Sequence, residues 1–385
     1  MVGYNACNVI PLNFFKMEPF MVTFFKCGHG DCAMINDTFN INGITEQVKL
    51  YVDLGPRSRS FRVPVPQGMA NVDLLITHSD DDHCCGYARS LNPNRIFVPA
   101  FFAEMETILL KLIFHKNTGI LNPNNVGRLV PVEESHPLVY SSNLKWDVFN
   151  PIRNKWGRWV SSLSIPLDGI ISRLDRFLSD MDIDLDVEGF IGVAREARKY
   201  YREHTAEYSD EDLRLFVVAV LFKIYLRSRK QKISLSKAIS AFRCHDANDY
   251  SIVFKYIDSD DNTFLFTGDA PSDVYVRPYQ NKSVRSRILK VPHHGSKTGF
   301  DLTNAVPPTS VAFSKIDPEF MVVSNANYLK APPNIDVLDF LSNQPGKHLL
   351  LTNDFTRLPR QLGRRGHRGV TVPYVFPQGI KAEIR

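Results

Sequence analysis

Histidines and carboxylates are concentrated in one short segment of this chain. The run from Thr77 to His83 reads THSDDDH, so two imidazoles and three carboxylates fall within six consecutive residues. So many carboxylates would repel one another unless a cation held them, and a mixture of imidazole and carboxylate suits a hard or borderline divalent metal. The run therefore predicts a metal site. A solvated acidic turn with incidental histidines is the alternative.

Two later segments supply further side chains of the same kinds. Asp269 follows the apolar run 263–266 through a Thr-Gly pair, and His293 and His294 follow an apolar stretch that ends at Val291. Because each motif follows a predicted strand, all three could meet at one edge of a sheet, where α/β layers often bind ligands. A lone Gly-Asp is usually a turn and paired histidines usually lie on a surface. The signal is the combination of the three motifs in this order.

The composition is that of an ordinary folded protein. The 385 residues suffice for one large domain or two smaller ones, and contents of 44% hydrophobic and 23% charged residues are typical of globular chains. No apolar run approaches the roughly 20 residues of a membrane helix, and the N-terminus lacks a signal-peptide pattern, so we expect a cytoplasmic protein with no membrane partner. Six cysteines do not indicate a disulfide framework here, and Cys84 and Cys85 are expected to pack as small apolar residues.

The net charge of +5 is mildly basic and permits an anionic substrate without requiring one. Local clustering is more informative than the total. A first basic cluster contains Arg227, Arg229, Lys230, Lys232, Lys237 and Arg243, and a second contains Arg357, Arg360, Arg364, Arg365 and Arg368. A solvated face is the default interpretation of each cluster, and contact with phosphate groups is the sharper alternative.

Short apolar runs indicate strands, and one longer run has helical spacing. The expected strands are 20–25, 32–35, 48–52, 72–76, 95–98, 129–132, 144–149, 251–254 and 263–266. Pro131 cannot donate a ladder hydrogen bond, so its strand is expected at the edge of a sheet. Apolar side chains recur at helical spacing over 101–113. Strands mixed with helices indicate an α/β layered protein.

The pattern changes near Pro151 and is helical from about 155 to 242, where two apolar stripes fit helix faces. We therefore expect three parts: residues 1–151 as the first part of an α/β domain, 152–244 as a helical insertion, and 245–385 as the second part of the domain with a basic C-terminal segment. The insertion interrupts the sheet just before Asn248. We expect it to pack against the mouth of the metal site and to restrict access.

The motifs together resemble those of metallo-β-lactamase-fold hydrolases, and within that superfamily the chain is most similar to the soluble hydrolase domain of ComEC-like proteins. The similarity covers roughly residues 20–151 and 245–345 and does not extend to the helical block. It implies an αββα sandwich with a helical insertion. The matching segments are Gly28-His29-Gly30-Asp31, Val52-Asp53-Leu54-Gly55, His78 to Gly86, Asn248-Asp249-Tyr250-Ser251, Thr267-Gly268-Asp269 and His293-His294-Gly295-Ser296.

The resemblance implies a site for two divalent ions, zinc or manganese. His78 and Asp80 would hold one ion, Asp82 and His83 would hold the other, and Asp269 would bridge the two. Either His293 or His294 would complete the second site.

Two positions depart from the usual superfamily pattern. Asp80 stands where most members have histidine, a feature shared with the ComEC-like branch, and the added oxygen ligand favours manganese relative to an all-histidine site. Asn248 stands where the middle histidine is expected, and the nearby His245 is expected to be a surface residue, so the first metal site is expected to be weak or vacant.

The resemblance implies a metal-dependent hydrolase that uses a metal-activated hydroxide, with Asp82 and His294 as catalytic residues. We expect a phosphodiesterase, and specifically a nuclease acting on nucleic acid. The expected substrate contacts are Ser296, Lys297, Asn248, Arg360, Arg364 and Arg365. Two alternatives remain open at this point: a hydrolase of a small ester, lactone or cyclic nucleotide, and a catalytically weak binding or sensing module. Protein partners cannot be named from these residues.

Overall fold

The computed structural model describes residues 22–56, 61–64, 72–88, 91–114, 128–152, 246–324, 333–352, 368–369, 374–375 and 382–384. The expected helical insertion, His245 and the first basic cluster lie outside the described residues. So do Arg360, Arg364 and Arg365 of the second basic cluster. Within the described ranges, no helix is long and apolar enough to cross a bilayer.

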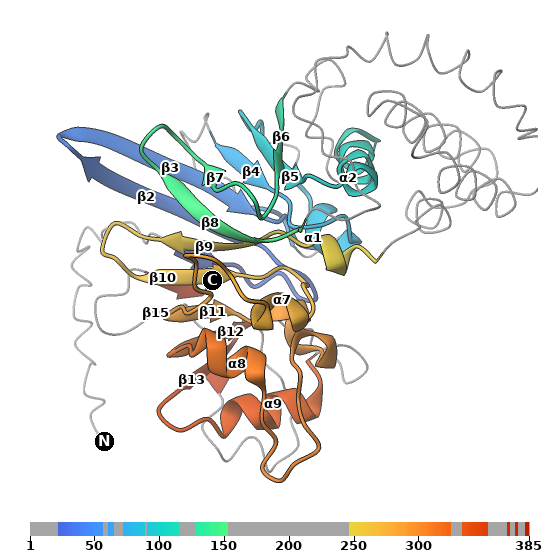
Figure 1. Ribbon diagram of the computed structural model, residues 1–385. Coiled ribbons are helices and arrows are strands. Elements are labelled where there is room, and N and C mark those ends of the chain that lie inside the picture. The colour runs from blue at the N-terminus through green and yellow to red at the C-terminus, as the bar shows by residue number, and fades with distance from the viewer. Residues whose placement is uncertain are drawn as a thin grey trace, which may run out of the picture.

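Two mixed sheets, each of eight strands in the described part of the chain, form the centre of the protein (Figure 1). The first sheet has the order β15 (Tyr374–Val375), β16 (Ala382–Ile384), β1 (Val22–Phe24), β2 (Ala33–Ile41), β3 (Ile44–Val52), β4 (Asp73–Leu75), β5 (Ile96–Pro99) and β6 (Leu129–Val132). The second has the order β14 (Arg368–Gly369), β13 (His348–Leu351), β12 (Phe320–Val323), β11 (Ile288–Lys290), β10 (Thr263–Phe266), β9 (Val253–Ile257), β8 (Lys145–Asn150) and β7 (Leu138–Val139).

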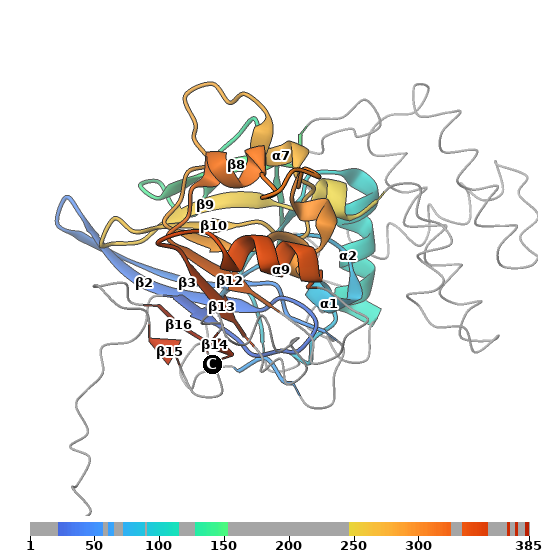
Figure 2. The ribbon, with the colours of Figure 1, turned by 90° about the horizontal axis from the view of Figure 1, so that it is seen from below.

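Helices cover the outer faces of the sheets. Figures 1 and 2 show α2 beside the first sheet and α9 against the second. The helices of the described chain are α1 (Asp81–Cys84), α2 (Phe102–Phe114), α7 (Asp273–Val276), α8 (Val311–Ile316) and α9 (Ile335–Ser342), with short 3-10 turns η2 (Asn248–Tyr250), η3 (Pro292–Gly295) and η4 (Lys297–Gly299). The protein is therefore of the mixed α/β class, as expected.

Three buried apolar clusters give the order of the layers. One lies between the sheets and contains side chains of both, such as Leu50 of β3 and Phe264 of β10. The second joins the outer face of the first sheet to α2, and the third joins the outer face of the second sheet to α7, α8 and α9. Because successive strand side chains point to opposite faces, Leu50 faces the other sheet while Tyr51 faces the α2 side. Strands buried on both faces read as continuous apolar runs, which is why the sequence predicts them.

Two details of the sheets bear on the expectations from sequence. Among the described strands, β6, which contains Pro131, is the last of its sheet, which agrees with the expected edge position. β8 and β9 are neighbouring antiparallel strands, with Val148 opposite Phe254. Residues 153–245 therefore connect two adjacent strands of one sheet, so they can be inserted without interrupting the order of the core strands.

Candidate metal centre

The predicted site residues converge because their parallel strands end at the same edges. β3 and β4 are parallel, as are β10 and β11, and each of the four is followed directly by a polar segment. Asp53 follows β3, the motif loop and α1 follow β4, Asp269 follows β10, and the paired histidines follow β11. The layered packing of the sheets brings these four segments close to one another. The turn between β1 and β2 lies beside them.

One group of donors surrounds Asp269. The His83 Nε2 atom lies 3.1 Å from Asp269 Oδ1, and the His78 Nε2 atom lies 3.8 Å from Asp269 Oδ2. All three side chains are buried, and the two imidazole rings are 4.1 Å apart. The periphery of this group is formed by Asp80, whose Oδ2 lies 3.6 Å from His78 Nε2, and by His293, whose Nε2 lies 3.7 Å from Asp269 Oδ2.

A second group of donors surrounds Asp82. Its Oδ2 atom lies 3.2 Å from His294 Nε2 and 3.2 Å from His29 Nε2. His83 connects the two groups, because its Nε2 atom is 3.3 Å from His294 Nε2. The sequence left His293 and His294 as alternatives for this position. The structure places the buried His294 beside Asp82, whereas His293 is partly exposed and pairs through Nδ1 with the Thr298 hydroxyl at 2.7 Å.

The ring of His83 is oriented by a carboxylate behind it. Asp53 Oδ2 accepts from His83 Nδ1 at 2.8 Å, and the other contacts of this carboxylate are the Thr77 hydroxyl and the Thr77 backbone N–H, both at 2.7 Å. A histidine that donates Nδ1–H to a carboxylate presents the Nε2 lone pair on its opposite side, which is the arrangement behind many metal-bound histidines. Asp53 therefore directs His83 Nε2 toward Asp269 and His294.

A carboxylate also lies beside His294, at ion-pair distance and without a hydrogen bond between the two. Its Nδ1 atom lies 3.4 Å from Asp31 Oδ1, and the other oxygen of Asp31 is 2.8 Å from the buried Lys290 ammonium. His293 and His294 both adopt left-handed backbone conformations, with φ of 47° and 52°. Non-glycine residues in this region cost on the order of 1 kcal/mol each, and such strain is concentrated at functional sites.

The motif loop is anchored to α2. Glu104 accepts from the backbone N–H of Ser79 at 2.9 Å and from its hydroxyl at 2.8 Å, and Lys111 donates to the Ser79 carbonyl and, at 2.7 Å, to Asp81. Glu104 and Lys111 are buried although both are charged. Sequence reasoning missed these two residues. The available signal was a pair of charges seven residues apart within the apolar stripe of the predicted helix.

Glu104→Gln is expected to destabilise the protein by about 1–3 kcal/mol, because a weaker acceptor is left facing two buried donors. Chemical denaturation of the metal-free protein measures the change. Glu134→Gln is a matched control: it weakens only a partly exposed ion pair with Arg277 and should cost less than about 1 kcal/mol. Equal effects of the two substitutions would contradict an anchoring role for Glu104.

The buried charges shift one another's protonation. Burial alone would lower the pKa of His294, but the carboxylates of Asp269 and Asp31 beside it raise that pKa to about 10. The pKa of His83 is raised well above its ordinary value, because Asp269 and Asp53 outweigh burial. Conversely, burial would raise the pKa of Asp269, but the neighbouring His83 and His294 lower it well below its ordinary range. Without a cation, the carboxylates therefore retain protons on the imidazoles.

Several buried polar atoms of the site make no hydrogen bond among the described residues. They include His78 Nε2, Asp269 Oδ1 and His294 Nδ1, even though charged groups lie 3.1 to 3.8 Å away. Hydrogen bonds normally satisfy such atoms. Converging nitrogen and oxygen donors that are close together but poorly aligned for hydrogen bonding fit a divalent cation.

The expected substrate contacts are less uniform. Asn248 lies in η2 with its side-chain oxygen buried and without a hydrogen-bond partner among the described residues. Ser296 accepts from the Thr298 hydroxyl at 3.3 Å, within the turn that follows the paired histidines. Lys297 is exposed, and its ammonium lies 2.6 Å from Asp336.

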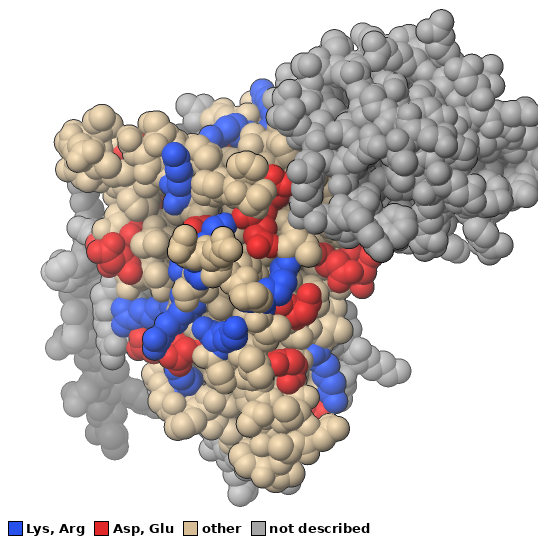
Figure 3. All heavy atoms as spheres, in the orientation of Figure 1, with Lys and Arg blue, Asp and Glu red and all other residues tan. Residues whose placement is uncertain are grey.

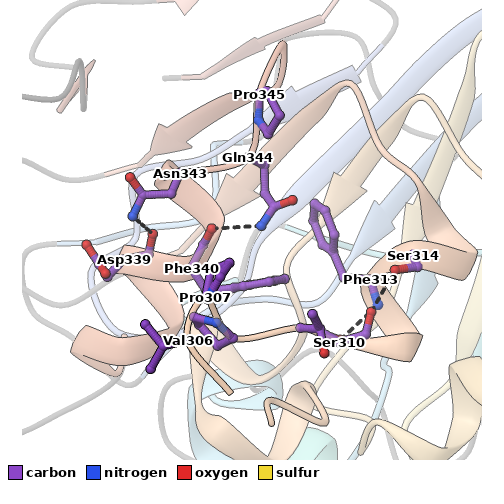
Figure 4. A pocket seen from close by; sticks show the side chains of 12 residues that line it. Val306, Pro307, Ser310, Phe313, Ser314, Asp339, Phe340, Asn343, Gln344 and Pro345 are labelled. Atoms are coloured by element: carbon purple, nitrogen blue, oxygen red, sulfur yellow. Dashed lines mark hydrogen bonds between the residues drawn. The ribbon is translucent and has the colours of Figure 1, made fainter. Parts of the chain in front are cut away.

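The surface of the described residues shows mixed charges and a cavity. On the face shown in Figure 3, Lys and Arg side chains are interspersed with Asp and Glu. A cavity of about 560 Å³ lies between α8, α9 and the loop that precedes α8 (Figure 4). Its lining includes Val306, Pro307, Phe313 and Phe340 but no metal-site candidate, so it is not part of the candidate centre.

No known protein-family model matches this chain. A search of curated proteins likewise found no significant match. Geometry and donor chemistry therefore carry the functional argument.

Proposed function

We propose that this protein is a metal-dependent hydrolase of phosphodiester bonds, built on a metallo-β-lactamase-like αββα sandwich. The observation that carries the proposal is the convergence of His78, His83, His294, Asp82 and Asp269, with neighbouring donor atoms 3.1 to 3.8 Å apart. A site for two ions, zinc or manganese, explains it.

Divalent cations held by these residues would supply Lewis acidity and would make water a nucleophile near neutral pH. The side chains would divide the remaining work. Asp53 fixes the tautomer of His83, and the pair of Asp31 and Lys290 supports His294. Asp82 has 21% of its side chain accessible, so it can reach and orient an incoming water molecule.

A phosphodiester substrate is supported by the character of the donors and of the chain. Asp80 makes the group around His78 richer in oxygen, which suits a hard cation that also binds phosphate oxygens. The net charge of +5 permits an anionic substrate, and the two basic clusters support one. The motifs shared with ComEC-like hydrolases support the same substrate class.

Metal analysis combined with a substrate panel tests the proposed function. Protein loaded with zinc or manganese should cleave DNA, RNA or bis-p-nitrophenyl phosphate, and chelated protein should not. Asp82→Asn should abolish turnover without unfolding the chain, because Asp82 lies outside the apolar clusters. Absence of bound metal together with no stimulation by either ion would overturn the proposal. Efficient hydrolysis of only a lactone, ester or cyclic nucleotide would replace the polymer with a small substrate.

The salt dependence of binding tests the contribution of the second basic cluster. Each arginine–phosphate contact contributes about 0.9 to the slope of log affinity against log salt on duplex DNA. Joint replacement of Arg360, Arg364 and Arg365 by Ala should therefore flatten the slope by up to about 3 and weaken all sequences equally. Turnover of bis-p-nitrophenyl phosphate should stay nearly unchanged.

Arg285→Ala is the control for this experiment, because Arg285 is an exposed arginine already paired with Asp317 at 2.7 Å. It should leave the slope nearly unchanged. An unaltered slope in the triple variant would show that these arginines form an ordinary solvated face.

A further inference from the structure

The turn between β1 and β2 brings an additional imidazole to the metal centre. His29 lies in this turn with its Nε2 atom 3.2 Å from Asp82 Oδ2, and its ring centre is 4.8 Å from that of His294. The donor atoms of His29, Asp82 and His294 all lie within 4.8 Å of one another. Nδ1 of His29 is buried without a hydrogen-bond partner among the described residues, so Asp82 is the contact that accounts for the orientation of the ring.

The backbone of the turn is attached to the metal-site elements. Asp31 N–H donates to the Asp82 carbonyl at 3.2 Å, and the Cys27 thiol donates to the Gly30 carbonyl at 3.0 Å. Gly30 has φ of +134°, and a side chain there would collide with the Asp82 carbonyl oxygen. Only glycine permits this close approach of the turn to α1. Hydrogen bonds of Cys27 and Asp31, on either side of His29 in the chain, thus hold His29 beside Asp82.

The spacing of the donor atoms matches ligands of a shared cation. Two donors bonded to one ion at about 2.0–2.2 Å, with ordinary angles between the bonds, lie roughly 3.0–3.4 Å from each other. The separations are 3.3 Å from His83 Nε2 to His294 Nε2, 3.2 Å from there to Asp82 Oδ2, and 3.2 Å from that oxygen to His29 Nε2. The distance from His29 to Asp82 is therefore in the same range as the distances between the other neighbouring donors.

We propose that His29 is a protein ligand of the metal ion held by Asp82 and His294. This inference rests on the proposed function, because it adds a residue to the same centre. With His29, the Asp82 site has three imidazole donors, because His83 and His294 also lie there. The site around His78, Asp80 and Asp269 is richer in oxygen. The two sites therefore differ in hardness, and a borderline ion such as zinc or cobalt(II) fills the Asp82 site first.

Zinc and cobalt(II) titrations of the full chain test the role of His29, with X-ray absorption spectroscopy to count imidazole ligands. In His29→Gln, the count at the first equivalent should fall by one, and the affinity for that equivalent should fall at least about 10-fold. The second equivalent should bind nearly as before. Gln preserves a hydrogen bond to Asp82, and circular dichroism of the metal-free variant verifies folding. If that variant does not fold, His29→Asn provides the same measurement.

His136→Gln is the matched control, since His136 is 74% exposed and contacts Glu133 instead of a candidate ligand. It should change neither the ligand count nor the affinity. An unchanged imidazole count and affinity in His29→Gln would overturn the inference and leave His29 as a hydrogen-bond partner of Asp82. A third outcome is that the wild-type protein binds metal, the variant has one imidazole ligand fewer, and neither protein hydrolyses a phosphodiester. The proposed substrate then fails while the ligand assignment stands. A wild-type chain that binds no metal overturns both.

Discussion

Replacing Asp269 by Asn is expected to lower phosphodiester turnover by at least about 1,000-fold. This carboxylate is the one side chain that approaches four imidazoles of the described site. Its Oδ1 atom lies 3.1 Å from His83 Nε2 and 3.7 Å from His294 Nε2, and its Oδ2 atom lies 3.8 Å from His78 Nε2 and 3.7 Å from His293 Nε2. An amide keeps the shape but removes the negative charge between both groups of donors. Metal content and steady-state turnover measure the effect.

Asp273→Asn is the control for Asp269. Asp273 lies four residues further along, in the first turn of α7, and the same change of charge there should leave metal content and turnover almost unaltered. Full retention of both ions by Asp269→Asn, with turnover within about tenfold of wild type, would contradict a bridging role for this residue.

The affinity for metal is expected to rise steeply between pH 6.5 and pH 10. Neighbouring carboxylates raise the pKa of His294 to about 10, and they also raise that of His83. A cation must displace the protons that these imidazoles carry, and each proton released increases the apparent affinity up to about tenfold per pH unit. Calorimetric titration in buffers of different ionisation enthalpy measures both the affinity and the number of protons released.

The stability of the metal-free protein should change in the opposite direction. A histidine whose pKa is raised on folding contributes its full stabilisation below the unfolded pKa of about 6.5, and this stabilisation is lost as pH rises toward the folded value. The lowered pKa of Asp269 contributes stability that is lost as pH falls below about 4. Thermal unfolding of chelated protein should therefore show the highest stability at mildly acidic pH.

Zinc-loaded protein should gain most in unfolding temperature at alkaline pH, where the metal competes least with protons. His136→Gln should not alter either pH profile, because this histidine is exposed and pairs with Glu133 instead of a candidate ligand. An affinity for metal that is independent of pH would show that His83 and His294 do not bind the cation.

Local sequence was sufficient to predict the strands that lead into the candidate site, but not β12 or β13 of the second sheet. Strands such as 263–266 are buried on both faces, so they read as continuous apolar runs and their ends are marked by polar residues. Pro131 was assigned to an edge because a missing N–H is a local property, and β6 is indeed the last strand of its sheet. The ligand candidates were also visible, since His78, Asp82 and His83 are crowded in one segment.

Tertiary structure alone decided which of these residues meet. The sequence could not show whether His293 or His294 lies beside Asp82, because the two are adjacent in the chain. The left-handed backbone of η3 directs His294 toward Asp82. His29 is 53 residues before Asp82 in the chain, and the backbone hydrogen bond from Asp31 N–H to the Asp82 carbonyl holds the two segments together. In the sequence, Glu104 and Lys111 are charged residues that interrupt an apolar stripe. Only the fold shows that both hydrogen-bond to Ser79. Residue type and strand pattern are properties of short segments, so the sequence determined which donor types lie at the ends of the predicted strands. The assembly of a metal centre depends on contacts between distant segments, and these follow only from how the two sheets and their helices pack.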